Sequence, residues 1–192
     1  MNSVKIADEI INIYKKHGFI EYGEQCNMLS HSVQTGLVAK AKGYDNELVL
    51  AGFLHDIGHL TPLEFNKDKL KTMGIYGVEQ HDKWGEAYLR KKGFSERIIA
   101  PVANHVKSKR YLCFIDTNYF NKLTYASKKT LEYQGGLITE EEAKSFEKTI
   151  YFKESLLIRQ AEEESKKQSF NVSYSHLNYY STLIKEALQG CV

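Results

Sequence analysis

Four histidines that recur about 25 residues apart constrain the fold of this chain more than any other feature. Each lies in a stretch with helical spacing and shares the apolar side of that stretch. One of them is followed directly by an aspartate inside a largely apolar run, residues 48–59. Burying several imidazoles and a carboxylate without a compensating cation costs several kcal/mol. The sequence therefore predicts helices packed around a metal site made by His31, His55, Asp56, His81 and His105.

The donor atoms limit which metals fit this site. Imidazole nitrogen and carboxylate oxygen suit divalent Mn, Fe, Co, Ni or Zn, whereas a set of thiolates would favour zinc. Because a carboxylate has two oxygens, Asp56 can bridge two ions, and four histidines leave donors for both. His59, one helical turn after His55, and Lys109, one turn after His105, then lie beside the site. An ammonium there indicates contact with a phosphate or carboxylate group of a substrate.

The composition limits the kinds of molecule that this protein is expected to bind. The 192 residues predict one domain spanning 1–192, and the net charge of +2 offers no strong field to nucleic acid or anionic lipid. The expected partner is a small anion such as a phosphorylated metabolite. Three cysteines without CxxC spacing indicate reduced thiols, and no stretch is long enough to span a bilayer. We therefore expect a cytoplasmic protein that binds neither nucleic acid nor membrane; its oligomeric state is left open.

Few breaks interrupt the helical pattern. Only two prolines occur, alternation typical of strands is rare, and the expected fold is all-α, a single helical bundle of about eight or nine helices. Asp45 or Asn46, Ser95 and Thr139 with Glu142 are the expected N-terminal caps. Residues 60–77 lack periodicity and predict a loop of the kind that often forms a lid. The expected helices cover residues 2–16, 25–42, 46–57, 78–92, 95–107, 117–132, 139–148, 151–165 and 174–189.

The order of these residues resembles the HD-domain superfamily, in which a first His is followed by a His-Asp pair and further His residues. Within it, the chain is similar to the PhnZ-like branch of mixed-valent di-iron oxygenases of phosphonate breakdown. The matching segments are residues 23–24, 31–34, 45–47, 55–59, 77–81, 105–112 and 126–136. The last segment, from Ala126 to Gly136, is not demanded by metal binding and so favours the branch over the superfamily at large.

The resemblance implies an Fe(II)/Fe(III) pair, with O2 as co-substrate. It implies a reaction that cleaves the C–P bond of a 1-hydroxyphosphonate, such as 2-amino-1-hydroxyethylphosphonate, to glycine and phosphate. It makes the five residues above ligands, with Asp56 as the bridge. It also places His59, Lys109 and Ser127 on the phosphonate and Glu24 at the amino end of the substrate. The residues it implies in catalysis are Asp56, His59 and Lys109.

Two departures keep other functions open. Ala161-Glu162 stands where the family has Trp-Asp, so Glu162 is the candidate last ligand. The rest of the acidic run that contains it, which is followed by Lys166, is typical of a solvated helix face. A tyrosine of the substrate site is displaced by one position to Tyr22. One alternative is a phosphohydrolase of a nucleotide or phosphomonoester that uses Mn, Co or Ni. The other is a degenerate HD module that binds a ligand without turnover.

Overall fold

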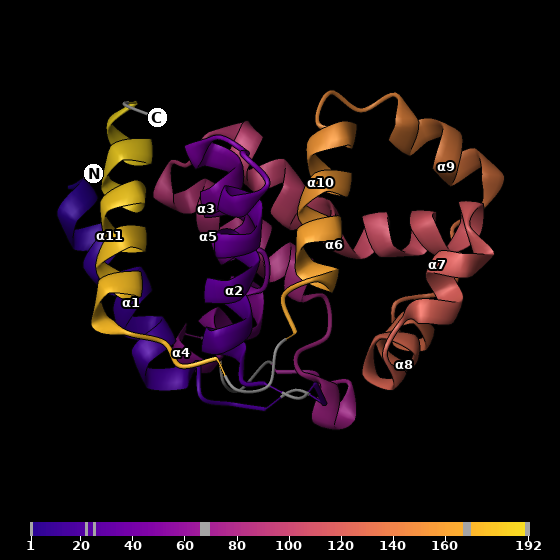
Figure 1. Ribbon diagram of the computed structural model, residues 1–192, viewed down its shortest axis with the longest axis horizontal. Helices are drawn as coiled ribbons and strands as arrows, with labels where there is room; N and C mark the ends of the chain where they lie inside the picture. The colour runs from indigo at the N-terminus through magenta and orange to yellow at the C-terminus, as the bar shows by residue number, and fades with distance from the viewer. Residues whose placement is uncertain (1, 22, 25, 66–69, 167–169, 191–192) are drawn as a thin grey trace.

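The fold is made of helices alone. The computed structural model describes residues 2–21, 23–24, 26–65, 70–166 and 170–190, and in these ranges it has no β-strand, only two isolated bridges (Figure 1). The predicted all-α class is therefore confirmed. The α-helices are α1 (Ser3–His17), α2 (Met28–Ala41), α3 (Asn46–Leu54), α4 (Thr61–Phe65), α5 (His81–Lys92), α6 (Glu96–Ile115), α7 (Thr117–Lys122), α8 (Tyr125–Tyr133), α9 (Glu140–Glu147), α10 (Phe152–Glu163) and α11 (Tyr174–Gln189); two 3-10 helices, η1 (Ile57–His59) and η3 (Gly74–Tyr76), complete the set.

The described residues contain more helices than the eight or nine predicted, for two local reasons. The segment 117–132, predicted as one helix, is α7 and α8, because Leu123 is extended and the Thr124 hydroxyl caps a new helix at the Ser127 amide. The segment 60–77, predicted as a loop, begins with the short helix α4. Helix α6 also continues to Ile115, eight residues past its predicted end.

Most of the predicted caps form. The Asp45 side chain accepts from the Leu48 amide at 3.1 Å, and Thr139 with Glu142 makes a capping box. Ser95 stands at the start of α6 as predicted, but its hydroxyl donates to Glu47 at 2.6 Å instead of capping the helix.

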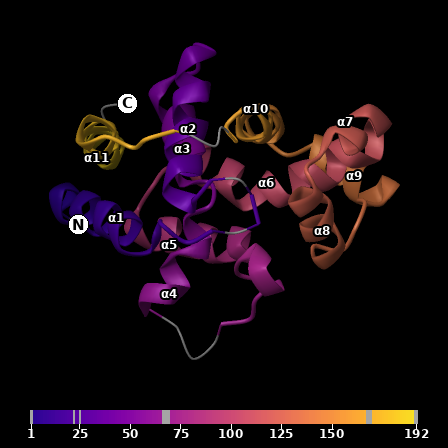
Figure 2. The same cartoon turned by 60° about the horizontal axis from the view of Figure 1, so that its bottom comes forward.

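Helix α3 is the centre of the main bundle. All its residues from Leu48 to Leu54 are buried, which explains the apolar run, and helices α1, α2, α5, α6, α10 and α11 supply the surrounding core (Figures 1 and 2). Tyr180 of α11 stacks on Phe53 with ring centroids 4.0 Å apart and donates to the Val33 carbonyl at 2.8 Å. The bundle thus has a rigid interior from which polar side chains can be positioned.

Helices α7, α8 and α9 lie apart from this bundle, beside the far end of α6 (Figures 1 and 2). We call residues 117–147 the outer lobe. Small apolar clusters fix it to α6: Tyr111 packs with Ile138, Ala143 and Phe146, and Cys113 packs with Leu123 and Leu131. Helix α6 therefore joins two separately packed parts.

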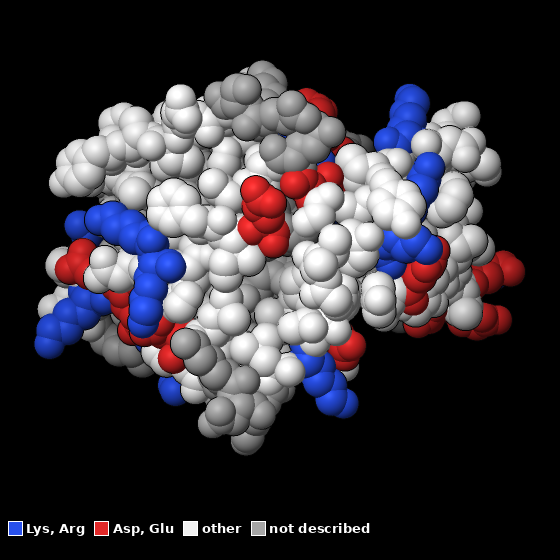
Figure 3. Space-filling model, turned by 90° about the horizontal axis from the view of Figure 1, so that it is seen from below, with Lys and Arg blue, Asp and Glu red and all other residues white. Residues whose placement is uncertain are grey.

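The surface carries mixed charge. On the face shown in Figure 3, Lys and Arg side chains lie toward the margins, whereas acidic side chains lie both near the middle and at the margins. Within the described ranges, no helix combines the length and hydropathy needed to cross a bilayer.

Candidate metal centre and adjoining pocket

Close packing of α2 against α3 brings the first two histidines together. His31 lies in the first turn of α2, which begins after Asn27 caps the Ser30 amide at 2.8 Å. Helices α2 and α3 cross at two glycines; a Cβ on Gly52 would already lie 3.4 Å from the Gly36 backbone. The His31 and His55 Nε2 atoms are 3.2 Å apart as a result.

Asp56 does not lie on the helix that was predicted to contain it. Helix α3 ends at Leu54, and Asp56 takes a non-helical conformation (φ −103°, ψ 10°) ahead of η1. Its carboxylate thereby reaches both sides of the centre. Oδ2 lies 3.1 Å from His55 Nε2, and Oδ1 lies 3.3 Å from His105 Nε2 and 3.7 Å from His81 Nε2.

The other two histidines meet across α5 and α6. His81 is the first residue of α5, directly after Gln80, which takes a left-handed conformation (φ 55°). Helix α5 also touches η1 backbone to backbone, since a Cβ on Gly58 would lie 1.8 Å from the His81 carbonyl oxygen. His105 comes from the middle of α6, and its Nε2 is 2.8 Å from that of His81.

Backbone carbonyls orient three of the imidazoles in the same way. The Nδ1 of His55, His81 and His105 faces the carbonyl oxygen three residues earlier, at 2.7, 3.2 and 2.7 Å respectively. A carbonyl only accepts, so Nδ1 carries the proton and Nε2 presents its lone pair to the centre. Two such lone pairs facing each other at 2.8 Å repel unless a cation lies between them. The donor set therefore fits a metal ion.

Glu162 completes the set from α10. Its side chain is buried, and one oxygen accepts from Arg159 one turn earlier, while Oε2 is buried without a hydrogen-bond partner in the described structure. Burial alone would raise the pKa of Glu162, but the Arg159 guanidinium and the neighbouring His55 bring it down to about 2. Glu162, the candidate last ligand, is thus a buried carboxylate with an oxygen available to an ion.

The donors fall into two groups. The ligand atoms of His31, His55 and Glu162 lie within 4.8 Å of one another, and so do those of Asp56, His81 and His105. Asp56 Oδ2 points to the first group and Oδ1 to the second. The six predicted ligands are therefore together, in an arrangement that could hold two ions with Asp56 between them.

His59 is oriented opposite to the three histidines above. Its Nδ1 accepts from the Val78 amide at 2.9 Å, so the neutral ring carries its proton on Nε2, which lies 4.0 Å from Asp56 Oδ1. Burial lowers the pKa of His59 to about 4, which keeps the ring neutral at pH 7. His59 is thus suited to donate a hydrogen bond beside the centre rather than to bind an ion.

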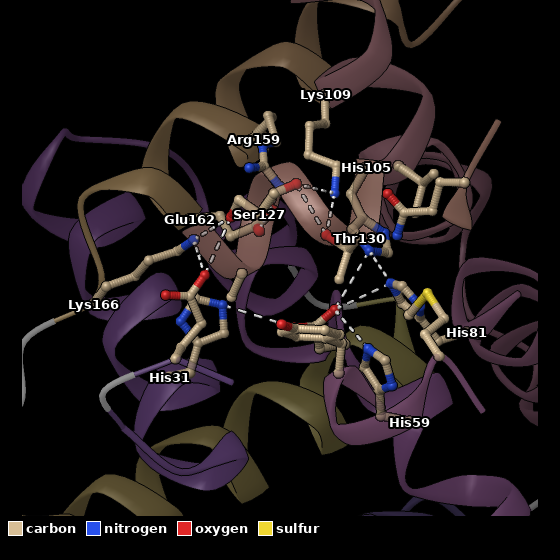
Figure 4. Close-up of a pocket in the computed structure, with 17 residues that line it drawn as sticks. His31, His59, His81, His105, Lys109, Ser127, Thr130, Arg159, Glu162 and Lys166 are labelled. Atoms are coloured by element: carbon tan, nitrogen blue, oxygen red, sulfur yellow. Dashed lines mark hydrogen bonds and ion pairs between the residues drawn. The ribbon is translucent and has the colours of Figure 1, made fainter. Parts of the chain in front are cut away.

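A cavity of about 40 Å³ adjoins the metal centre and is lined on the far side by the outer lobe (Figure 4). Lys109 Nζ reaches it from α6 and donates to Thr130 Oγ1 at 2.7 Å and weakly to the Ser127 carbonyl. Burial lowers the pKa of Lys109 to about 7, and the nearby positive charge of Arg159 adds to the effect. Glu24 and Ser127 line the same cavity. Tyr22, the remaining candidate, lies outside the described residues.

Sequence reasoning missed two cations of this site. Arg159 lies on the buried side of α10 beside Glu162, and the spacing of three residues between them was a usable signal. Lys166 follows α10 and binds Glu24 Oε1 at 2.8 Å and Ser127 Oγ at 2.9 Å. No local pattern indicates that contact, because Glu24 is far away in the sequence.

The chain is similar over most of its length to several known proteins. The HD domain family model matches residues 28–149. An uncharacterised protein of Acanthamoeba polyphaga mimivirus is 38% identical, over 96% of this chain and 83% of the relative. Hydroxymethylphosphonate dioxygenase of Gimesia maris is 31% identical, over 94% of this chain and 87% of the relative. The glycine-betaine-forming [1-hydroxy-2-(trimethylamino)ethyl]phosphonate dioxygenase of Leisingera caerulea is 34% identical, over 87% of this chain and 83% of the relative. The resemblance seen in the sequence is confirmed: this chain belongs to the HD-domain family, and its relatives include proteins named as phosphonate dioxygenases.

Proposed function

We propose that this protein is an iron-dependent dioxygenase that cleaves the C–P bond of a small 1-hydroxyphosphonate. The observation that carries the proposal is the position of Lys109, His59 and Ser127 around one small cavity next to a centre with two groups of donors. Two relatives named for the oxidation of hydroxyphosphonates support it. The reaction balances as a 1-hydroxyalkylphosphonate plus O2 giving a carboxylic acid plus phosphate.

Six side chains would hold the iron. His31, His55 and Glu162 form one group, His81 and His105 form the other, and Asp56 lies between them. A bound pair of iron ions would supply the redox chemistry by which O2 oxidises the carbon that bears the hydroxyl group.

The protein itself supplies the recognition of the phosphonate. The Lys109 ammonium and the His59 Nε2–H would both donate to phosphonate oxygens, and the Thr130 hydroxyl lies 2.7 Å from Lys109 Nζ. Charge-assisted hydrogen bonds of this kind are about twice as strong as neutral ones. Lys109 is almost fully buried, so a bound anion would restore its charged state and would exclude water from the cavity.

The test is an oxygen-electrode assay of iron-loaded protein, with phosphate release followed by 31P NMR. We expect hydroxymethylphosphonate or a larger 1-hydroxyalkylphosphonate to be consumed with one O2 per phosphate formed. Lys109→Met should raise KM strongly, whereas Lys107→Met, which removes a charge from the same helix outside this cavity, should not. Absence of O2 consumption with all 1-hydroxyphosphonates tried would refute the proposal.

A phosphohydrolase is the alternative, because the same nitrogen and oxygen donors suit Mn, Co or Ni. The small cavity favours a small substrate over a nucleotide. The same assay separates the two functions: a hydrolase releases phosphate from a phosphomonoester under anaerobic conditions, and the oxygenase does not. Binding of a hydroxyphosphonate without turnover in either assay would indicate the degenerate module.

A further inference from the structure

We propose that the pocket selects 1-hydroxyphosphonates whose far end carries no positive charge, because Lys166 already neutralises Glu24 there. This inference rests on the proposed function and names the class of substrate within it.

The contacts of Glu24 are the first observation. Its Oε1 accepts from Lys166 Nζ at 2.8 Å, from Thr124 Oγ1 at 2.8 Å and from Ser127 Oγ at 3.1 Å. The side chains of Lys166 and Glu24 are only 12% and 7% exposed. In Figure 4, Lys166 reaches across from the end of α10 toward Ser127. An ammonium of the protein thus occupies a position at which a cationic group of a substrate would have to meet this carboxylate.

The distribution of charge around the cavity is the second observation. Glu162 is paired with Arg159 and Glu24 with Lys166, so the carboxylates outside the bridging Asp56 are matched within the described part of the chain. Lys109 differs from these cations, since it donates hydrogen bonds to a hydroxyl and a carbonyl. The charges that line the cavity therefore leave the Lys109 cation to be balanced by one bound anion. It offers no unmatched carboxylate to a cation, whereas Lys166 would repel one at short range.

Binding under anaerobic conditions tests this without turnover. The two probes are 1-hydroxypropylphosphonate and 2-amino-1-hydroxyethylphosphonate, which have equally many non-hydrogen atoms and differ in a methyl against an ammonium group. Affinities for the iron-loaded protein are measured by isothermal titration calorimetry. We expect the parent to bind the uncharged compound roughly tenfold more tightly, since like charges in contact cost at least that much.

Variants of Lys166 separate charge from shape. Lys166→Met keeps the aliphatic stem and releases Glu24, so the preference should reverse toward the amino compound. Lys166→Arg keeps the charge and should keep the parent's preference. Lys42→Met is the matched control, because Lys42 forms a surface ion pair with Glu164 at 2.8 Å near the same end of α10. Lys166→Gln repeats the neutral change should the Met variant fail to fold.

Each failure is recognisable. Equal binding of the two probes by the parent, or an unchanged ratio in Lys166→Met and Lys166→Gln, would overturn the inference while hydroxyphosphonate oxidation stands. If neither compound binds to the parent or to the variants, the proposed function fails and this inference fails with it. A reversed preference in Lys166→Met that disappears when Glu24→Gln is added would support the assignment.

Discussion

Replacing Gly58 by alanine should disrupt one half of the metal centre. An alanine Cβ at this position would lie 1.8 Å from the His81 carbonyl oxygen and 2.6 Å from the Gly85 amide nitrogen, although such contacts are not found below 3.0 Å. Both clashing atoms are backbone, so no side chain can rotate away. Helix α5 must therefore move about 1 Å away from η1, and overpacking of this kind costs roughly 3 kcal/mol.

The same displacement separates two ligands. Asp56 Oδ1 lies 3.7 Å from His81 Nε2. Two atoms bound to one ion at about 2.1 Å each can be no more than about 4.2 Å apart. A movement of α5 by about 1 Å away from η1 would take these two atoms to about 4.7 Å, beyond that limit. The group formed by Asp56, His81 and His105 should lose its ion, while the group that contains His31 keeps its own.

Urea denaturation and elemental analysis of metal content measure the two effects. Gly85→Ala is the matched control. Its Cβ would be close only to the Val102 side chain, at 3.0 Å, which can shift, and would lie at an ordinary contact distance of 3.5 Å from the Gly58 amide nitrogen. Alanine also gains about 1 kcal/mol of helix propensity. We expect Gly58→Ala to lose about 3 kcal/mol of stability and one of its two ions, and Gly85→Ala to lose neither. A Gly58→Ala protein with the stability and metal content of the parent would refute the close approach and the shared ligand.

Three further predictions concern charge and metal. Under the proposed function the charged form of Lys109 would bind the phosphonate. Because burial lowers the pKa of Lys109 to about 7, affinity should be constant below pH 7 and fall above it, whereas Lys109→Arg should keep its affinity at high pH. Calorimetry across pH would show no difference between the parent and Lys109→Arg if Lys109 does not contact the substrate. The pKa of Glu162 lies below its ordinary 4.5, at about 2, so its ion pair with Arg159 stabilises the metal-free protein above pH 4.5 and is lost as pH falls toward 2. Glu162→Gln should therefore be several kcal/mol less stable at pH 7 and equal to the parent near pH 2 in denaturant titrations; a gap independent of pH contradicts the pairing. Removing the metal with a chelator should lower Tm by about 10 °C, as expected for a ligand present at about a thousand times its Kd, and an unchanged Tm in calorimetry would show that the centre holds no ion.

The sequence predicted the helical class and the candidate ligands that the fold brings together, because both depend on local patterns. Helical spacing and the cost of burying imidazoles are visible over a few residues. The position of Asp56 was predicted less well. The apolar run continues through Ile57 and Leu60 as a helix would, yet the chain leaves α3 after Leu54. A continuous apolar pattern does not reveal that change of conformation.

The part of the pocket around Lys166 and Glu24 depends on contacts between residues far apart in the sequence. Lys166 and Glu24 are 142 residues apart, and an acidic run followed by lysine is the ordinary pattern of an exposed helix. Glu164 is exposed as that pattern predicts, whereas Glu162, the candidate ligand, is buried. The difference comes from the packing of α10 against α2 and α6.

Helix α6 connects the two parts of the molecule that line the pocket, the main bundle and the outer lobe. Its 20 residues span about 30 Å, with His105 in the bundle and Tyr111 in the core of the outer lobe. The ions would belong wholly to the bundle, whereas the hydroxyls of Ser127 and Thr130 are borne by α8. A mutation in the lobe could therefore exchange one set of pocket hydroxyls for another and leave the candidate metal ligands unchanged. In a family with this arrangement, the residues that contact the substrate can change while the metal ligands stay the same.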